Sequence, residues 1–172
     1  MMDRHVFLIG MPGSGKSSLG RRLAGRLGIP YVDTDTAIAA MTGMTVQQIF
    51  EGPGEQAFRN AETNLLMHLA DEKPAIVSTG GGLVMREENR LIMRNQGFIV
   101  LIDRPLEDIL ADIRLERRPL LAAKGKGEVA RLYEERIEVY RQLADAVLDT
   151  SRGYTSGIIG LERLVAQLTK GG

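Results

Sequence analysis

The sequence contains no cysteine, and this absence removes several chemistries at once. Disulfide bonds, thiolate metal ligands and cysteine nucleophiles are all excluded, and the composition is compatible with a reducing compartment. Neither sign of charge is in excess, because 22 lysine and arginine residues balance 22 aspartate and glutamate residues. The chain therefore lacks the electrostatic signature of a nucleic-acid-binding or membrane-surface protein.

Long apolar runs are also missing. The run from Val6 to Met11 stops at Pro12-Gly13, and it is too short for the core of a signal peptide or for a membrane span. We therefore expect a cytoplasmic protein that binds neither membrane nor nucleic acid. A chain of 172 residues that is 44% hydrophobic fits one compact domain, residues 1–172, and no apolar surface stripe calls for a partner, so we expect a monomer.

Short apolar runs alternate with helical patterns along the chain. This alternation predicts an α/β fold in which helices cover both faces of a five-stranded parallel sheet. The expected strands are Val6–Ile9, Tyr31–Val32, Ala75–Ser78, Phe98–Ile102 and Ala146–Leu148.

Helix signals lie between these strands. We expect one helix to end at Gly28, a second to begin at a Thr45/Gln48 capping box, and a third to carry Phe58, Ala61, Leu65 and Leu69 on one side. A fourth should run from Pro105 toward Arg117, and two more should cover Glu128–Leu143 and Ser156–Leu168. Pro119, Gly125 and Gly127 interrupt the helical pattern and predict a mobile lid over approximately residues 112–127.

The strongest motif is GMPGSGKS, Gly10 to Ser17, which lies between an expected strand and an expected helix. It fits the phosphate-binding loop G-x-x-x-x-G-K-[ST], whose backbone N–H groups and helix N-terminus bind phosphates. Lys16 would reach the β- and γ-phosphates of a nucleotide, and Ser17 would ligate Mg²⁺. We assign nucleotide binding to Gly13, Ser14, Gly15, Lys16, Ser17 and Ser18.

A carboxylate for the metal has two possible sources. Asp103 ends an apolar strand, but Arg104-Pro105 follows it, so we expect it to cap the next helix rather than to bind metal. Asp33 and Asp35 follow the second strand at a spacing that points both side chains the same way if the chain stays extended. Asp33 would then help hold hydrated Mg²⁺ and Asp35 would accept the proton of an acceptor hydroxyl, although either could instead cap the following helix.

Two further groups are candidates for the acceptor site, one within the expected acceptor-binding region, approximately residues 33–62, and one beyond it. Arg59 and Glu62 are spaced to pair on one helix, which leaves open a surface salt bridge or a rigid arginine that binds a carboxylate. Gly80, Gly81 and Gly82 end a strand and would let the backbone approach a ligand, with a plain loop as the alternative.

Taken in order, these motifs resemble the shikimate kinase family along nearly the whole chain. They are GMPGSGKS, VDTD, GE before FRNAE, STGGG, RRPLL, and the Arg136–Tyr140 segment before LADAVLDTS. The resemblance implies a three-layer P-loop kinase fold and transfer of the γ-phosphoryl of ATP, with Mg²⁺, to the 3-hydroxyl of shikimate in aromatic amino-acid synthesis.

The resemblance also implies residue roles. It places Mg²⁺ at Asp33, the shikimate hydroxyls at Asp35, and shikimate at Arg59, the three glycines and Arg136, and it directs Arg118 of the lid to the ATP phosphates. Arg136 precedes Ile-Glu-Val-Tyr instead of the family's Pro-Leu-Tyr, so we expect its helix to run on. Arg114 and Arg152 are candidate adenine contacts by position alone, with ordinary solvated arginines as the alternative.

Other readings remain open from the motifs alone. Another P-loop small-molecule kinase, such as a gluconate or nucleoside monophosphate kinase, would share the phosphate site. A nucleotide-binding regulatory module without phosphotransfer would share it too, but such a module does not need the second carboxylate, Asp35.

Overall fold

The computed structural model describes residues 2–113 and 124–170. Arg114, Arg118 and most of the expected lid therefore lie outside the described residues. Within the described ranges, no helix combines the length and the apolar character needed to cross a membrane.

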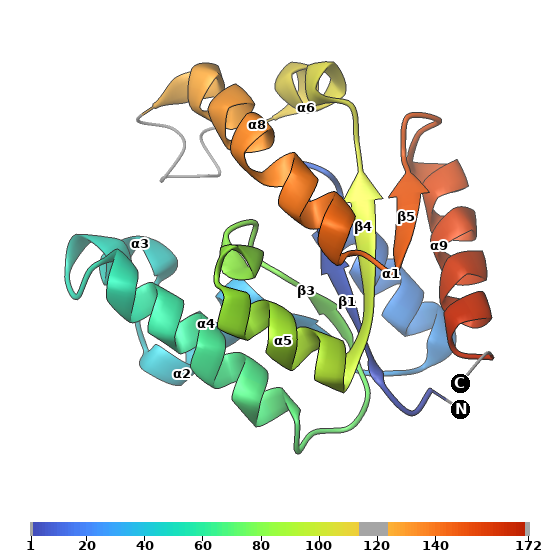
Figure 1. Cartoon of the computed structure of the whole chain (residues 1–172), viewed down its shortest axis with the longest axis horizontal. Coiled ribbons are helices and arrows are strands. Elements are labelled where there is room, and N and C mark those ends of the chain that lie inside the picture. Colours follow the sequence, from blue (N-terminus) through green and yellow to red (C-terminus); the bar gives the residue numbers. More distant parts are fainter. Residues whose placement is uncertain (1, 114–123, 171–172) are drawn as a thin grey trace.

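Five parallel strands form one sheet in the order β2-β3-β1-β4-β5 (Figure 1). The expected parallel sheet is thus confirmed, and β1 lies at its centre, with Val6 opposite Ile76 on β3 and opposite Phe98 on β4. The strands are β1 His5–Ile9, β2 Tyr31–Asp33, β3 Ile76–Ser78, β4 Gly97–Asp103 and β5 Ala146–Asp149.

Helices cover both faces of the sheet. Alternate residues of β1 point to opposite sides and are apolar on both, so each face needs a helical layer to bury it. Phe7 and Ile9 join a core that includes residues of α4, α5 and α8, whereas Val6 and Leu8 pack with α1 and α9. The helices are α1 Lys16–Leu27, α2 Thr34–Thr42, α3 Val46–Glu51, α4 Glu55–Leu69, α5 Glu87–Gln96, α6 Leu106–Asp112, α8 Gly125–Leu143 and α9 Tyr154–Leu168, with a 3₁₀ turn, η1, at Leu83–Met85.

Local signals at the helix ends agree with the expectations. Gly28 ends α1 in the left-handed conformation, with φ 65°, which glycine adopts at little cost. Thr45 and Gln48 form the capping box of α3. Helix α8 runs unbroken through Arg136 to Leu143, as expected from the absence of proline after Arg136.

Several expectations about helices were wrong. The chain does not stay extended through Asp35, because α2 begins at Thr34 and Asp33 caps it, accepting a hydrogen bond from the Thr36 N–H at 3.2 Å. Gly125 and Gly127 lie within the first turn of α8 instead of interrupting it. Gly125 has φ 72°, a conformation that glycine adopts at little cost. Helix α5 was not among the expected helices.

Asp103 does not cap α6, contrary to expectation. The N-cap of α6 is Pro105, which makes no side-chain cap. The side chain of Asp103 instead lies 3.8 Å from Arg141 of α8, and its backbone oxygen accepts hydrogen bonds from Thr150. The helix that begins there ends at Asp112, earlier than the expected Arg117.

Candidate active site

A cleft of about 1060 Å³ lies at the carboxyl ends of β1, β2 and β3, the edge at which ligands bind open parallel sheets. It brings together residues that the sequence analysis assigned to the nucleotide and to the acceptor. The predicted residues that line it are Gly13, Gly15, Lys16, Ser17, Ser18, Asp33, Asp35, Arg59, Gly80, Gly81, Gly82 and Arg136.

The phosphate loop is built from backbone. Gly10, Gly13 and Gly15 have φ values of 143°, 84° and 98°, a region that other residues rarely adopt. A Cβ at Gly10 would also come within 2.6 Å of the Ile102 backbone oxygen. Helix α1 begins after Gly15 with no side-chain cap, so its first N–H groups face the loop, where a phosphate would accept hydrogen bonds.

Lys16 and Ser17 open α1 and have different partners. The Lys16 ammonium is held over the loop, where it donates to the backbone oxygens of Gly10 at 2.7 Å and Met11 at 2.9 Å. The Ser17 hydroxyl donates to the Asp33 carboxylate at 2.9 Å. The Asp33 carboxylate therefore links two helices, because one oxygen accepts from Ser17 of α1 and the other caps α2.

Ser17 and Asp33 offer a hydroxyl and a carboxylate oxygen at one point of the cleft. Among the described residues no group of three or more His, Cys, Asp or Glu side chains could hold a metal ion. A cation at this point would therefore have few protein ligands. Mg²⁺ fits such a site, because it is usually held by one or two protein oxygens together with water and substrate phosphates.

Arg104 supports the phosphate loop, a role that no sequence motif predicted. It donates to the Gly13 backbone oxygen at 3.1 Å and pairs with Asp112 of α6. Sequence offers no signal for this contact, because Arg104 reaches the loop only through the pairing of β4 with β1.

Each glycine of the Gly80–Gly82 loop lies against a different predicted acceptor residue. A Cβ at Gly80 would come within 2.8 Å of the Asp35 carboxylate, and one at Gly82 within 2.6 Å of the Arg59 guanidinium. A Cβ at Gly81 would lie 3.1 Å from Arg136. The missing side chains thus let three charged groups from α2, α4 and α8 converge on one turn.

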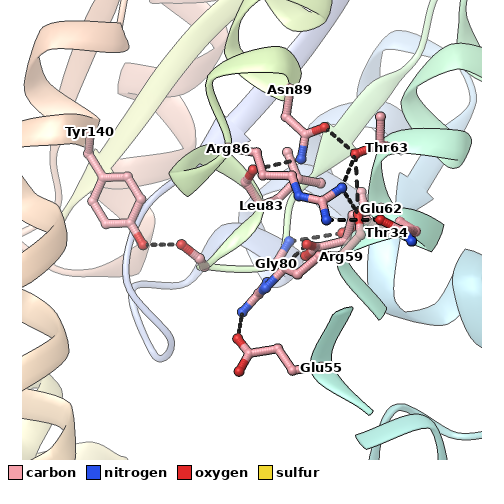
Figure 2. A network of polar contacts seen from close by, with 12 residues as sticks. Thr34, Glu55, Arg59, Glu62, Thr63, Gly80, Leu83, Arg86, Asn89 and Tyr140 are labelled. Carbon is pink, nitrogen blue, oxygen red and sulfur yellow. Dashed lines mark hydrogen bonds and ion pairs between the residues drawn. The ribbon is translucent and has the colours of Figure 1, made fainter. Parts of the chain in front are cut away.

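Arg59 is held by two carboxylates, as Figure 2 shows. The expected pair with Glu62 is present at 2.9 Å, and Glu55, which had not been anticipated as a partner, accepts a second bond at 3.1 Å. The Arg59 side chain is 20% exposed and that of Glu62 is fully buried. Burial raises the pKa of Glu62 to about 7, which Arg59 opposes and the nearby Asp35 carboxylate reinforces.

Tyr140 and Arg136 lie one turn apart on α8. The Tyr140 hydroxyl donates to the Gly81 backbone oxygen at 2.6 Å (Figure 2), and burial raises the pKa of Tyr140 to about 12, so this donor stays protonated. The Nε atom of Arg136 is buried and has no hydrogen-bond partner among the described residues. The atom that lies against Gly81 is Nη1 of Arg136, since a Cβ at Gly81 would be 3.1 Å from it, and Arg136 lines the cleft.

Of the predicted nucleotide residues that the structure describes, Ser14 and Arg152 do not line the cleft. The side chain of Ser14 is turned inward, since the residue is only 3% exposed. Arg152 is exposed in the turn after β5, a turn that the Tyr154 hydroxyl holds near α1 by a 3.3 Å bond to the Ser18 oxygen. Arg118 lies outside the described residues.

One wall of the cleft, the phosphate wall, is the backbone of the predicted phosphate loop, and the other, the acceptor wall, carries the predicted acceptor residues Asp35, Arg59 and Arg136. The class that this fold and cleft define is the P-loop kinases of small molecules. The family model of shikimate kinase matches residues 12–167, and a shikimate kinase from Clostridium beijerinckii is 44% identical over 151 residues, 88% of each chain. The chain belongs to the shikimate kinase family, which the motifs had indicated, and is an ATP-dependent kinase.

Solved structures agree. A shikimate kinase from Acinetobacter baumannii in complex with shikimate is 32% identical and superposes with a TM-score of 0.86, covering 97% of this chain and 94% of that one. A shikimate kinase from Aquifex aeolicus, also 32% identical, gives a TM-score of 0.81 with 98% and 99% covered. The expected P-loop kinase fold is thereby confirmed.

Proposed function

We propose that the chain transfers the γ-phosphoryl group of ATP to the 3-hydroxyl of shikimate, which yields shikimate 3-phosphate and ADP. The observation that carries the proposal is the Gly80–Gly82 loop, on which Asp35, Arg136 and Arg59 converge in the same cleft as the phosphate loop. Shikimate has a carboxylate for the two arginines and hydroxyls for Asp35 and the glycine backbone.

Asp35 is the residue to which we assign the acceptor hydroxyl. The bond from the hydroxyl oxygen to the γ-phosphorus forms as the bond from the β,γ-bridging oxygen breaks, and the hydroxyl proton passes to the Asp35 carboxylate. Asp35 lies in the first turn of α2 and lines the cleft. A carboxylate at this position orients the nucleophile, and most of the catalysis in phosphoryl transfer comes from such positioning and from charge stabilisation.

On the nucleotide side, the loop from Gly13 to Ser18 binds the phosphates and the Lys16 ammonium neutralises charge on them. Ser17 and Asp33 would hold Mg²⁺, whose positive charge offsets charge on the phosphate oxygens during transfer. Arg118, from the lid over approximately residues 112–127, completes the proposal as a further cation at the ATP phosphates. Arg152 is proposed at the adenine.

The same proposal includes the location, the oligomeric state and the pathway of the enzyme. We place it in the cytoplasm, as a monomer that serves aromatic amino-acid synthesis. Family membership argues against gluconate and nucleoside monophosphate kinases, and the acceptor wall argues against a regulatory module, because holding a nucleotide does not require two arginines facing Asp35 across a glycine loop.

The test is ADP release by purified protein with Mg-ATP, measured with shikimate, gluconate or a nucleoside monophosphate added separately. We expect release that depends on shikimate. Release with another acceptor would keep the phosphate site and overturn the assignment of the arginines. Equal release with no acceptor would favour a nucleotide switch or an ATPase.

A further inference from the structure

Behind the acceptor wall, a chain of polar side chains joins α4 to the segment that follows the glycine loop (Figure 2). Its members are Thr63 of α4, Arg86 before α5, and Asn89 within α5. Thr63 is 5% exposed and Asn89 is fully buried. None of the three lines the cleft, so none is in a position to touch substrate.

Arg86 makes the first link, to the backbone of Arg59. Its Nη1 atom donates to the Arg59 backbone oxygen at 3.2 Å and to the Thr63 hydroxyl at 3.1 Å. Its Nη2 atom donates to the Asn60 side chain at 2.9 Å. The planar fork of one arginine thus contacts successive turns of α4.

Asn89 makes the second link, to the residue after Gly82. The Thr63 hydroxyl donates to the Asn89 side-chain oxygen at 2.8 Å, and the Asn89 amide donates to the Leu83 backbone oxygen at 2.9 Å. A buried asparagine that meets both a donor and an acceptor has one satisfactory orientation. The distance between α4 and Leu83 is therefore set by directional bonds.

These links end at the backbones of Arg59 and of Leu83, which follows Gly82. On the side of these two segments that faces the cleft, the Arg59 guanidinium lies against Gly82. A Cβ at Gly82 would be 2.6 Å from Nη1 of Arg59. We infer that Thr63, Arg86 and Asn89 are positioning residues that hold Arg59 in register with the glycine loop for the acceptor's carboxylate. Glu62 and Glu55 orient the guanidinium, and this network sets the main chain from which it extends.

The inference rests on the proposed function, because it concerns binding of the acceptor. An arginine that binds a carboxylate through two parallel hydrogen bonds depends on orientation as well as distance, and displacements near 1 Å are costly in an active site. Loss of the network should therefore weaken acceptor binding selectively, since the phosphate loop lies between β1 and α1 and is supported by other contacts.

The experiment compares Thr63→Val with Thr63→Ser. Valine keeps the shape of threonine and removes the hydroxyl that joins Arg86 to Asn89, whereas serine keeps the hydroxyl. We expect Thr63→Val to raise the KM for shikimate about fivefold, with the KM for ATP changed less than about twofold, and Thr63→Ser to stay near wild type.

Two further variants separate positioning from general loss of stability. Val165→Ala removes buried volume from α9 on the opposite face of the sheet, and its Tm gives a matched control; an equal rise in shikimate KM in this variant would overturn the inference. Arg86→Lys keeps the charge, loses the fork, and should raise the shikimate KM even if Thr63→Val does not fold.

The outcomes also distinguish this inference from the function on which it rests. If the wild-type protein is inactive with shikimate, the proposed function fails and the inference fails with it. If wild type is active but neither Thr63→Val nor Arg86→Lys changes the shikimate KM, the inference alone is wrong.

Discussion

The two walls of the cleft are built in different ways. The phosphate wall comes from one continuous segment, Gly10 to Ser18, in which backbone conformation and a helix N-terminus form the site. The acceptor wall gathers side chains from α2, α4 and α8 around one glycine turn. A backbone site depends on its glycines having positive φ, whereas the acceptor site depends on side-chain placement, so substitutions should affect the two substrates separately.

The largest expected effect is on turnover and comes from Asp35→Asn. Asparagine keeps the size of aspartate but accepts no proton, so we expect turnover to fall by roughly a hundredfold or more. ATP affinity, measured by equilibrium binding, should stay close to wild type because the phosphate wall is unchanged. Near-normal turnover would mean that Asp35 is not the acceptor's proton-accepting or positioning group.

Gly82→Ala tests the acceptor wall more directly. The new methyl group would meet the end of a flexible side chain, the Arg59 guanidinium at 2.6 Å, which can move away without disrupting the fold. We expect the shikimate KM to rise about tenfold, which corresponds to about 1.4 kcal/mol of lost binding, while the ATP KM changes little.

Gly25→Ala is the matched control for that variant. Gly25 lies inside α1, and a Cβ there would meet nothing within 4 Å. Alanine should therefore stabilise the protein by about 0.5–1 kcal/mol, measured by urea unfolding, and leave both KM values unchanged. An unchanged shikimate KM in Gly82→Ala would show that Arg59 does not bind the acceptor from this position.

The raised pKa of Glu62, beneath the acceptor wall, predicts that the stability of the folded protein depends on pH. Its pKa is raised from 4.5 in the unfolded chain to about 7 in the folded protein. Its contribution to stability is therefore fully present below pH 4.5 and is lost as the pH rises through 7. Between these values, wild type should lose at least about 1 kcal/mol of unfolding free energy relative to Glu62→Gln.

Urea unfolding of both proteins from pH 4.5 to 8 measures this difference. Glu55→Gln is the control, because Glu55 pairs with the same arginine but its side chain is 65% exposed, where solvent weakens an ion pair. Parallel stability curves for wild type and Glu62→Gln would contradict the assignment.

The smallest expected effect is on the nucleotide side. Arg152 is exposed and outside the cleft lining, and a cation stacked on an aromatic ring at such a site contributes about 0.5–1 kcal/mol. Arg152→Ala should therefore raise the ATP KM about two- to fivefold and leave the shikimate KM alone. An unchanged ATP KM would remove Arg152 from the nucleotide site.

Prediction from sequence was most successful where the signal is local. The five strands, the capping box at Thr45 and the end of α1 at Gly28 each depend on neighbouring residues. It was least successful where a residue has two possible partners. Asp103 had the position of a helix cap, but Arg141 and Thr150, distant in sequence, contact it instead.

The site shows the same limit. Pairing of Arg59 with Glu62 follows from their spacing on one helix and was predicted, whereas Glu62's burial and the support of Arg59 through Arg86 required the packing of α4 beside α5. The contact of Arg104 with the phosphate loop could not be predicted either, because it depends on the pairing of β4 with β1.

Residues close together in the chain are enough to specify the phosphate loop and the alternation of strands and helices, because a glycine-rich turn and an apolar period act over a few residues. The contacts of Gly80, Gly81 and Gly82 with Asp35, Arg136 and Arg59 in turn arise only when distant segments pack together. The Tyr140 hydroxyl donates to the backbone oxygen of Gly81, 59 residues away in the sequence, and the Gly80 N–H donates to the Thr34 hydroxyl, 46 residues away. The second contact exists because β3 pairs with β2, and no local pattern encodes that strand order.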